Sequence, residues 1–291
     1  MMEVIIFEIT GGIGKNIAAT AVIRAIKKQH SDSKLIVITA YPAVFVNNPN
    51  VHRILNFNTP HVYDDYVRDN KVIFMCLDPY KSNSHLTQAK HLSESWCEIN
   101  NVGWDGARPE LFLSPLEIQR ARNLTKTEKP LLLFQPFGGF KNDVKYSWNR
   151  DIPPLQAQEL ANALSQQYTI FQIANPKQIL LNKTTHYHNN NLRELFALVA
   201  ISSRRLGIDS MLQHCCAALK LSATVCWVSN TPKVFGYDVH QNIFSTGSSS
   251  AVRHTLEGIY EMYDFTGSRT YDFPFDSLDV FNVGEIQKTL N

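Results

Sequence analysis

The sequence predicts an α/β protein built from two doubly wound domains. Short apolar runs, which are typical of buried strands, alternate with segments of helical periodicity, and this pattern indicates parallel sheets covered on both faces. The alternation stops over residues 100–129, where polar residues and prolines accumulate, and then starts again. We therefore expect an N-terminal domain over 1–125 and a C-terminal domain over 126–291.

In the first half, four apolar segments are expected to form strands, over residues 3–9, 34–40, 51–57 and 71–76. Apolar residues recur at helical spacing over 16–29, where Asn16 is a suitable N-cap residue. A second helix is expected over 86–99. The carboxyl ends of such strands are where ligands bind in doubly wound sheets.

In the second half, the strands are expected over 130–137, 168–174, 204–208 and 223–229. The helices are expected over 153–167, 191–202, 209–221, near 254–264 and near 283–290. Packing of the last helix on the N-terminal domain is an alternative to packing within its own domain. With two such domains, the cleft between them is the expected binding site.

Composition excludes several classes of protein. The formal net charge of +2 is too small to argue for nucleic-acid binding by itself. No apolar run approaches the roughly 20 residues that span a bilayer, and the N-terminus lacks the features of a signal peptide. The five cysteines lack C-x-x-C spacing, and His186 and His188 lie in a segment expected to be a polar loop. We expect a cytoplasmic protein with reduced thiols and no metal site.

The stretch EITGGIGKNIAATAV, over residues 8–22, resembles a phosphate-binding loop but fits neither glycine pattern. The nucleotide loop G-x-x-x-x-G-K-[ST] requires a glycine where this chain has Ile9, and a serine or threonine where it has Asn16. The dinucleotide pattern G-x-G-x-x-G requires a glycine where this chain has Ile17. Three glycines remain that allow a sharp turn and the close approach of a ligand to the following helix: Gly11, Gly12 and Gly14. A plain strand-to-helix turn fits the stretch equally well.

A second loop carries a more specific pattern, RRLGIDSMLQHCCAALKL, over residues 204–221. Asp209 and Ser210 stand where a helix N-cap belongs, and His214 follows one turn later. A helix start with a hydroxyl, free amides and an imidazole has the chemistry of a diphosphate site. The structural alternative is a capping residue followed by a buried histidine.

Five segments carry a resemblance to a known family. They read GGIGKNIAATAVIRAIKKQHSDSKLIVIT, NNPNVHRIL, KYSWNRDIPPLQAQELANAL, NLRELFALVAISSRRLGIDSMLQHCCAALKL and TVCWVSNTP. Through these segments, over residues 3 to about 236, the chain resembles the heptosyltransferase-type glycosyltransferases (glycosyltransferase family 9), which include the ADP-heptose:lipopolysaccharide heptosyltransferases. The resemblance implies the GT-B fold, in which two Rossmann-like domains face each other across a cleft.

The resemblance implies a donor site in the second domain. Asp209, Ser210 and His214 match a D-[ST]-G-x-x-H pattern at which the donor diphosphate sits. Lys145, shortly before Trp148, matches a lysine that contacts the diphosphate, and its point charge suits a leaving phosphate. The donor-binding residues expected in full are Gly138, Gly139, Lys145, Asp209, Ser210, Met211, His214, Ser229 and Asn230.

The chain departs from the family pattern in three places. Lys15 stands where many members carry an acidic residue that resembles a general base, and a protonated lysine is a poor base. A base from elsewhere in the first domain is then needed, and the candidates are Glu8, Asp64, Asp65 and Asp78, of which Asp78 follows a strand end. Residues 175–178 read NPKQ where a glutamate often holds the nucleoside, and Met211 replaces a glycine.

These observations predict an inverting, metal-independent glycosyltransferase. It moves a sugar from an ADP- or UDP-linked sugar, as co-substrate and without another cofactor, to an acceptor hydroxyl. We expect Asp78 and Lys15 to be catalytic, and Gly11, Gly12, Gly14 and Asn16 to bind the acceptor. The resemblance favours a saccharide acceptor, whereas the slight basic excess and Lys15 favour a modified base in DNA. A non-catalytic protein that binds sugar nucleotides or glycans is a further alternative.

Overall fold

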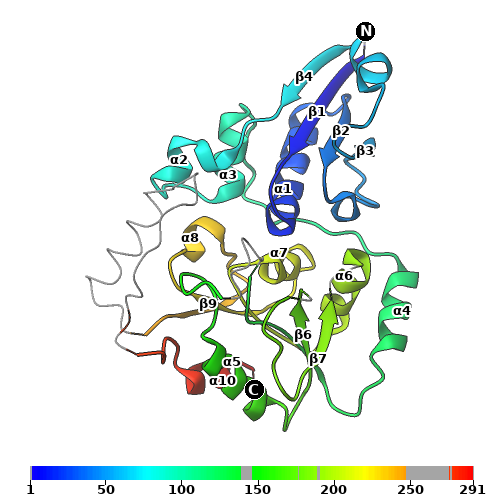
Figure 1. Cartoon of the computed structure of the whole chain (residues 1–291). Coiled ribbons are helices and arrows are strands. Elements are labelled where there is room, and N and C mark those ends of the chain that lie inside the picture. The colour runs from blue at the N-terminus through cyan, green and yellow to red at the C-terminus, as the bar shows by residue number, and fades with distance from the viewer. Residues whose placement is uncertain are drawn as a thin grey trace. The chain divides into compact units, whose positions relative to one another are not determined.

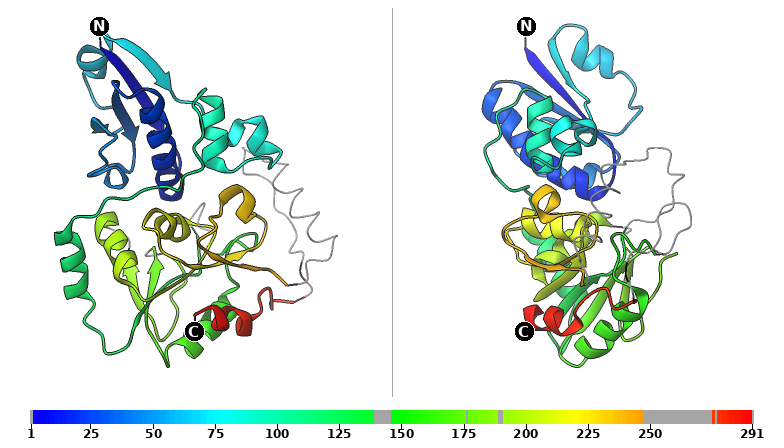
Figure 2. Two further views of the ribbon diagram at one scale, coloured as in Figure 1. Left: turned by 180° about the vertical axis from the view of Figure 1, so that it is seen from behind. Right: turned by 90° about the vertical axis from the view of Figure 1, so that its left-hand side faces the viewer.

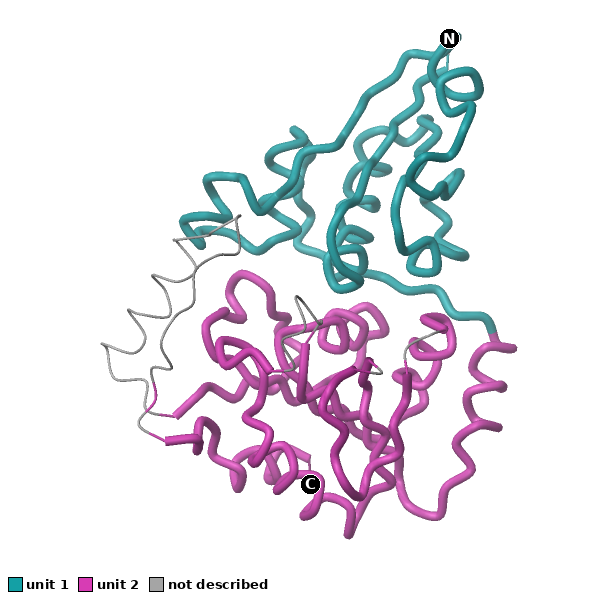
Figure 3. Tube along the Cα trace, viewed as in Figure 1, with its two compact units in different colours: residues 1–114 teal, residues 115–291 magenta. Residues whose placement is uncertain are grey.

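The structure in Figure 1 is a computed structural model that describes residues 2–138, 146–175, 177–188, 191–246, 275 and 277–290. The chain divides into two compact units, Met1–Ser114 and Pro115–Asn291, which Figure 3 colours separately. This boundary precedes the predicted one at 125/126, because helix α4 (Pro115–Leu124) packs on helix α6 (Leu192–Ile201) of unit 2. The guanidinium of Arg193 donates to both carboxylate oxygens of Glu117, at 2.6 and 2.8 Å, and joins the two helices.

Unit 1 is built on a parallel sheet with the strand order β3–β2–β1–β4. The four strands are β1 (Glu3–Ile9), β2 (Lys34–Thr39), β3 (Arg53–Leu55) and β4 (Lys71–Met75). In the register, Ile5 lies between Leu35 of β2 and Ile73 of β4. All four predicted strands are therefore present, although the third is shorter than the apolar run over 51–57.

The helical segments of unit 1 differ from the prediction at two places. They are α1 (Ile13–Gln29), η1 (Pro42–Val44), η2 (Tyr63–Val67), η3 (Pro79–Lys81), α2 (Asn83–Leu86) and α3 (Leu92–Ile99). Asn16 is not an N-cap residue, because α1 already begins after Gly12, whose extended backbone caps it. The single helix expected over 86–99 is interrupted, since Gln88 has a φ of 52°, which an α-helix does not allow.

The core of unit 1 lies on both faces of its sheet. Helices α1 and α3 pack together on one face, where the ring of Phe7 meets the ring of Trp96 edge-on at 5.3 Å. On the other face, Val4 and Ile6 pack with Tyr66 of η2. Because alternate residues of a strand point to opposite faces, β1 reads as a continuous apolar run.

Unit 2 is built on a parallel sheet with the order β10–β9–β8–β5–β6–β7. The strands are β5 (Leu131–Gln135), β6 (Thr169–Ala174), β7 (Thr185–His188), β8 (Arg204–Ile208), β9 (Thr224–Trp227) and β10 (Gln241–Phe244). Both edge strands escaped the prediction, and the polar loop expected at His186 and His188 was wrong. β7 is largely polar because an edge strand is exposed, so it lacks the apolar run of a buried strand.

Helices cover both faces of the unit 2 sheet. They are α4, α5 (Pro154–Leu164), α6, α7 (Met211–Ala218), α8 (Pro232–Phe235) and α10 (Val283–Leu290). On one face, Phe134 and Ile208 join a core with α5 and α10. On the other face, Leu212 of α7 packs against Gly207, where an added Cβ would come within 3.2 Å of it.

The last helix belongs to unit 2. Figure 2 shows α10 beside α5 in both views, and the side chain of Gln156 on α5 donates to the Phe281 carbonyl at 2.7 Å and accepts from its N–H at 3.0 Å. Within unit 2, α10 also contacts β9 and β10. The helix expected near 254–264 lies outside the described residues. Within the described ranges, every helix is too short or too polar to span a bilayer.

Replacing Gln156 with methionine should destabilise unit 2, because it leaves a buried N–H and a buried carbonyl of Phe281 without partners. Each unpaired group costs about 1–3 kcal/mol, so the loss of unfolding free energy for the two groups should be about 2–6 kcal/mol. Urea unfolding measures this loss, and hydrogen exchange over 283–290 should accelerate. Gln167→Met, at an exposed position of the same unit, is the matched control. Equal stability of the two variants would contradict the assigned role.

Candidate functional site

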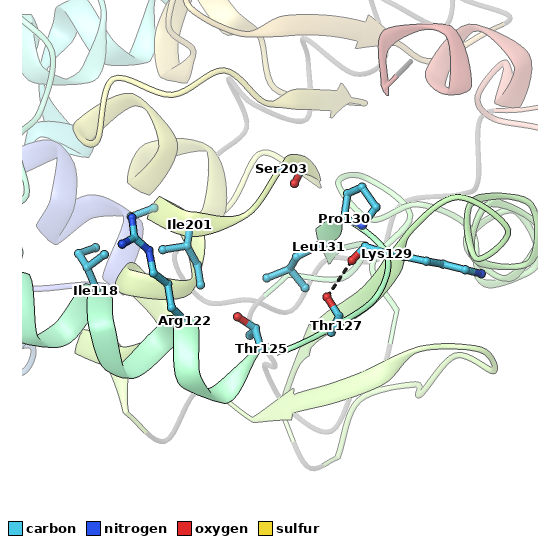
Figure 4. Close-up of a pocket in the computed structure, with 10 residues that line it drawn as sticks. Ile118, Arg122, Thr125, Thr127, Lys129, Pro130, Leu131, Ile201 and Ser203 are labelled. Atoms are coloured by element: carbon cyan, nitrogen blue, oxygen red, sulfur yellow. Dashed lines mark hydrogen bonds between the residues drawn. The ribbon is translucent and has the colours of Figure 1, made fainter.

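The carboxyl edge of each sheet is the expected place for a ligand site, and unit 2 also has hollows away from that edge. Figure 4 shows one of about 460 Å³, whose lining includes Arg122, Lys129 and Ser203. Within it, the hydroxyl of Thr127 donates to the carbonyl of Lys129 at 2.7 Å. Leu131, which also lines it, begins β5, so the hollow lies at the amino edge of the sheet. Doubly wound sheets bind their ligands at the opposite edge.

At the carboxyl edge of unit 2, the start of α7 is capped by a residue from another strand. Ser210 is the N-cap residue, as predicted, but its hydroxyl does not cap the helix. Instead, Gln135 at the end of β5 accepts from the Leu212 N–H at 3.0 Å and donates to the Ser210 hydroxyl at 3.1 Å. The helix start and the end of β5 are thereby fixed to each other.

Asp209 does not cap α7; its carboxylate is buried and joins two loops. One oxygen accepts from the side-chain amide of Gln213 at 3.1 Å, and the other accepts from the side-chain amide of Asn230. Burial raises the pKa of Asp209, and the hydrogen bond from Asn230 opposes the shift. Asn230 follows β9, so Asp209 links the ends of β8 and β9.

His214 lies within α7 and is buried, as the structural alternative expected. Its Nδ1 lies 2.8 Å from the hydroxyl of Tyr237, and the two rings meet edge-on at 5.6 Å. The side-chain amide of Gln213 lies 3.3 Å from its Nε2. Met211, in the first turn, is also buried. The imidazole is therefore held in one orientation by the residues that surround Asp209.

Asp151 joins Gly138 and Ser147, which lie on either side of two predicted donor residues. The buried carboxylate of Asp151 accepts from the N–H of Gly138 at 2.8 Å and from the N–H of Ser147 at 2.9 Å. Burial raises the pKa of Asp151, while the neighbouring Arg150 opposes this. Gly139 and Lys145, between these two anchors, lie outside the described residues.

Two further contacts order this region. Arg150 lies against Gly138, where an added Cβ would be 2.0 Å from its Nη2, so no other residue fits at Gly138 without displacing the guanidinium. The hydroxyl of Ser229 donates to the carbonyl of Asn149 at 2.6 Å. The predicted residues Gly138, Ser229 and Asn230 thus belong to the ordered loops at the carboxyl edge of unit 2.

In unit 1, the turn after β1 is ordered from within. Gly11 has a φ of +90°, and a Cβ there would lie 2.9 Å from Cδ of Lys15, so the position requires glycine. Gly12 is exposed with open space beside it, and Gly14 lies in the first turn of α1. The side chain of Asn16 is fully buried, and it bonds to the Gly12 carbonyl at 3.0 Å and to Thr39 at 2.5 Å. It holds the turn against the end of β2.

Lys15 and Asp78 form an ion pair at the carboxyl edge of unit 1. Nζ of Lys15 lies 2.8 Å from Oδ1 of Asp78. The lysine side chain is only 3% exposed, whereas that of Asp78 is 30% exposed. The ammonium also lies over the rings of Tyr80, at 4.8 Å from the centroid, and Trp96, at 5.3 Å. Such ring faces attract cations.

His85 lies beside this ion pair. Its imidazole is 5.0 Å from the Tyr80 ring, between centroids, and is almost fully buried. Burial lowers its pKa to about 4, an effect to which Lys15 adds and which Asp78 opposes. The ring is therefore neutral near pH 7, and the cluster of Lys15, Asp78, Tyr80, His85 and Trp96 carries one positive and one negative charge.

The structure adds residues that the sequence did not single out. In unit 2 they are Gln135, Asp151 and Gln213, and in unit 1 they are Tyr80, His85 and Trp96. Gln135 ends β5 and Tyr80 follows β4. Both positions could have been found from the rule that ligands bind at the carboxyl ends of strands. Trp96 and His85 come from helices whose packing partner cannot be read from local sequence.

Comparison with known proteins gives structural matches alone. No protein-family model matches the chain, and no curated protein does. A family 9 glycosyl transferase from Veillonella parvula DSM 2008 is 13% identical, with a TM-score of 0.68 over 99% of this chain and 96% of that one. E. coli ADP-heptose LPS heptosyltransferase II is 13% identical, with a TM-score of 0.62 over 88% and 94%. E. coli heptosyltransferase WaaC with ADP is 12% identical, with a TM-score of 0.56 over 88% and 99%.

Structural matches at such low sequence identity show the fold alone. The chain has the GT-B fold with two Rossmann-like domains, which confirms the predicted fold class and the structural resemblance to family 9 glycosyltransferases.

The burial of His85 predicts a pH-dependent stability. Its pKa is 6.5 when unperturbed and about 4 in the folded chain, so the folded state keeps it neutral. The stability that the neutral ring gives to the folded state is fully present above pH 6.5 and is lost as the pH falls toward 4. His85→Gln should flatten this part of the stability profile, measured by urea unfolding from pH 7 to 4. His52→Gln, at an exposed position, should keep the wild-type slope, and a shared slope in all three proteins would refute the assignment.

Proposed function

We propose that the protein is a glycosyltransferase that moves a sugar from a nucleoside-diphosphate sugar to an acceptor hydroxyl. The observation that carries the proposal is the carboxyl edge of unit 2, in a chain with the fold of family 9 glycosyltransferases. There the start of α7, a helix that also carries the buried His214, is tied to the end of β5 through Gln135 and to the loop after β9 through Asp209 and Asn230. A helix start of this kind favours an anion.

In this proposal, unit 2 holds the diphosphate of the donor. The N-terminal amides of α7 and the Ser210 hydroxyl supply hydrogen bonds, and Lys145 supplies a point charge. Asp151 does not bind the diphosphate in this proposal. It supports the site because its carboxylate joins Gly138 and Ser147, which flank the segment with Gly139 and Lys145. Arg150, which lies against Gly138, adds a second positive charge near the same loop.

The reaction that we propose is a single displacement with inversion at the anomeric carbon. The acceptor oxygen forms a bond to this carbon as the bond to the diphosphate breaks, and the electron pair leaves with the nucleoside diphosphate. Positive groups around the diphosphate stabilise the charge that develops there. E. coli heptosyltransferase II and WaaC are named for the transfer of heptose, and WaaC was solved with ADP. We therefore propose a saccharide acceptor and an ADP-linked donor, with UDP as the second nucleotide to test.

Neither alternative from the sequence gains support. The modified-DNA acceptor rested on a small basic excess and on Lys15, and Lys15 is buried against Asp78. A non-catalytic sugar-nucleotide-binding protein would bind the donor without releasing the sugar. A panel of ADP-, UDP- and GDP-linked sugars, assayed for free nucleoside diphosphate, distinguishes it from an enzyme.

Calorimetry with ADP and UDP tests the donor site. We expect the affinity for one of them to fall at least tenfold in Lys145→Ala and in His214→Asn, because the first removes a charge and the second removes the imidazole behind the helix start. Lys129→Ala and His186→Asn, which lie at the amino edge and on the edge strand, are the matched controls. Unchanged affinity in both site variants would overturn the proposed donor site.

A further inference from the structure

We propose that Asp78 is the general base for the acceptor hydroxyl, and that Lys15 is the residue that positions it. This inference rests on the proposed glycosyl transfer and assigns its proton acceptor. The sequence predicts that both residues are catalytic, and the inference gives each of them a separate part in the reaction.

The two oxygens of Asp78 have different surroundings. Oδ1 accepts from Nζ of Lys15 at 2.8 Å and from the backbone N–H of Tyr80 at 3.1 Å. Oδ2 accepts no hydrogen bond from the described residues, and the side chain is 30% exposed. One oxygen is therefore anchored, while the other has the freedom and the access to receive a proton.

Lys15 is built into the unit as a support. Its ammonium is covered by the rings of Tyr80 and Trp96, and its stem lies against Gly11, where the absence of a Cβ leaves it room. A ligand phosphate could bind this ammonium only by displacing the carboxylate of Asp78. That displacement would leave the carboxylate of Asp78 without its cation and next to a second anion, which is unfavourable.

His85 fits this arrangement because it adds no charge. Its imidazole is neutral near pH 7, so Lys15 faces a single anion and Asp78 faces a single cation. The Ser82 hydroxyl, which accepts from the backbone N–H of His85 at 3.2 Å, fixes the start of the short helix that carries it. The aromatic and imidazole rings thus form a rigid wall around the ion pair.

The other acidic candidates of unit 1 lie in unsuitable places. Asp64 and Asp65 belong to η2, which precedes β4 and packs at the amino end of the sheet. Asp64 is also paired with Arg68. Glu8 is within β1, on the face opposite to Phe7 and Trp96. Among the four candidates, Asp78 combines a position beyond the carboxyl end of a strand with an anchored carboxylate.

The proposed step balances as follows. The acceptor O–H bond breaks and its proton goes to Oδ2 of Asp78, while the acceptor oxygen bonds to the anomeric carbon of the donor. The bond from that carbon to the diphosphate oxygen breaks, and its electron pair leaves with the nucleoside diphosphate. Protonated Asp78 then returns the proton to solvent. Lys15 takes no part in the proton transfer.

The test uses the full chain and the sugar nucleotide that gives the fastest release of nucleoside diphosphate in the panel above. With water as acceptor, Asp78→Asn should slow this release about 10²–10⁴-fold, while calorimetric affinity for the nucleoside diphosphate stays within twofold of wild type. Asp65→Asn is the matched control and should retain the wild-type rate. An Asp78→Asn rate within threefold of wild type would overturn the proposal.

Azide provides an independent readout, because this nucleophile carries no proton that a base must remove. Azide should restore turnover in Asp78→Ala and yield a glycosyl azide, whereas it should not accelerate the wild type comparably. Since a misfolded variant cannot be rescued by a nucleophile, rescue also shows that the variant is folded. Failure of azide to restore any turnover in a variant with a wild-type circular dichroism spectrum would count against a base role.

The positioning role of Lys15 has its own readout. Lys15→Met should slow the release of nucleoside diphosphate while calorimetric affinity for the nucleoside diphosphate stays within twofold of wild type, because the carboxylate of Asp78 loses the hydrogen bond that orients it. Lys15→Arg, which keeps a donor beside Oδ1, should restore most of the rate. Equal losses of rate in the two variants, or a wild-type rate in Lys15→Met, would overturn the positioning role. If the wild type binds no nucleoside diphosphate and releases none from any sugar nucleotide, the proposed function fails, and this inference fails with it.

Discussion

Parallel pairing of every strand with its neighbours is the constraint from which the candidate sites follow. In both sheets each connection must return the chain to the same starting edge, so the carboxyl ends of all strands lie along the opposite edge. Residues that are far apart in the sequence meet there. In unit 1 this brings together the turn after β1 and the segment after β4, and in unit 2 the ends of β5, β8 and β9.

The two edges are stabilised by different means. Unit 2 joins its loops through hydrogen bonds between side chains and backbone groups, as Gln135 does for α7 and as Asp151 does for Gly138 and Ser147. Unit 1 places an ion pair in a largely apolar setting. A buried ion pair contributes little net stability, because desolvation of the two charges offsets their attraction, yet removal of one partner is costly. The Lys15–Asp78 pair is thus better explained by orientation of a carboxylate than by stability.

Local patterns in the sequence were sufficient for the strands of unit 1 and for the central strands of unit 2, and insufficient for the two edge strands of unit 2. The apolar runs of β1, β2, β5 and β8 identified central strands, since burial on both faces demands such runs. The edge strands β7 and β10 lack that demand and were missed. The start of α1 was misplaced because Asn16 has the chemistry of an N-cap, but its side chain is used to hold Thr39. The pairing of Lys15 with Asp78 spans 63 positions, and no local pattern encodes it.

In the proposed mechanism, the same constraint lets a strand end supply the base although Lys15 stands where the resemblance to family 9 predicts an acid. A carboxylate can reach the carboxyl edge from any strand of a parallel sheet, because every strand ends there. If the turn after β1 carries a cation, a neighbouring strand end can supply the anion, provided that the cation is enclosed and cannot compete for the ligand. Tyr80 and Trp96 provide that enclosure. A motif search that requires the acid at one position would miss this arrangement, whereas the edge of the sheet preserves it.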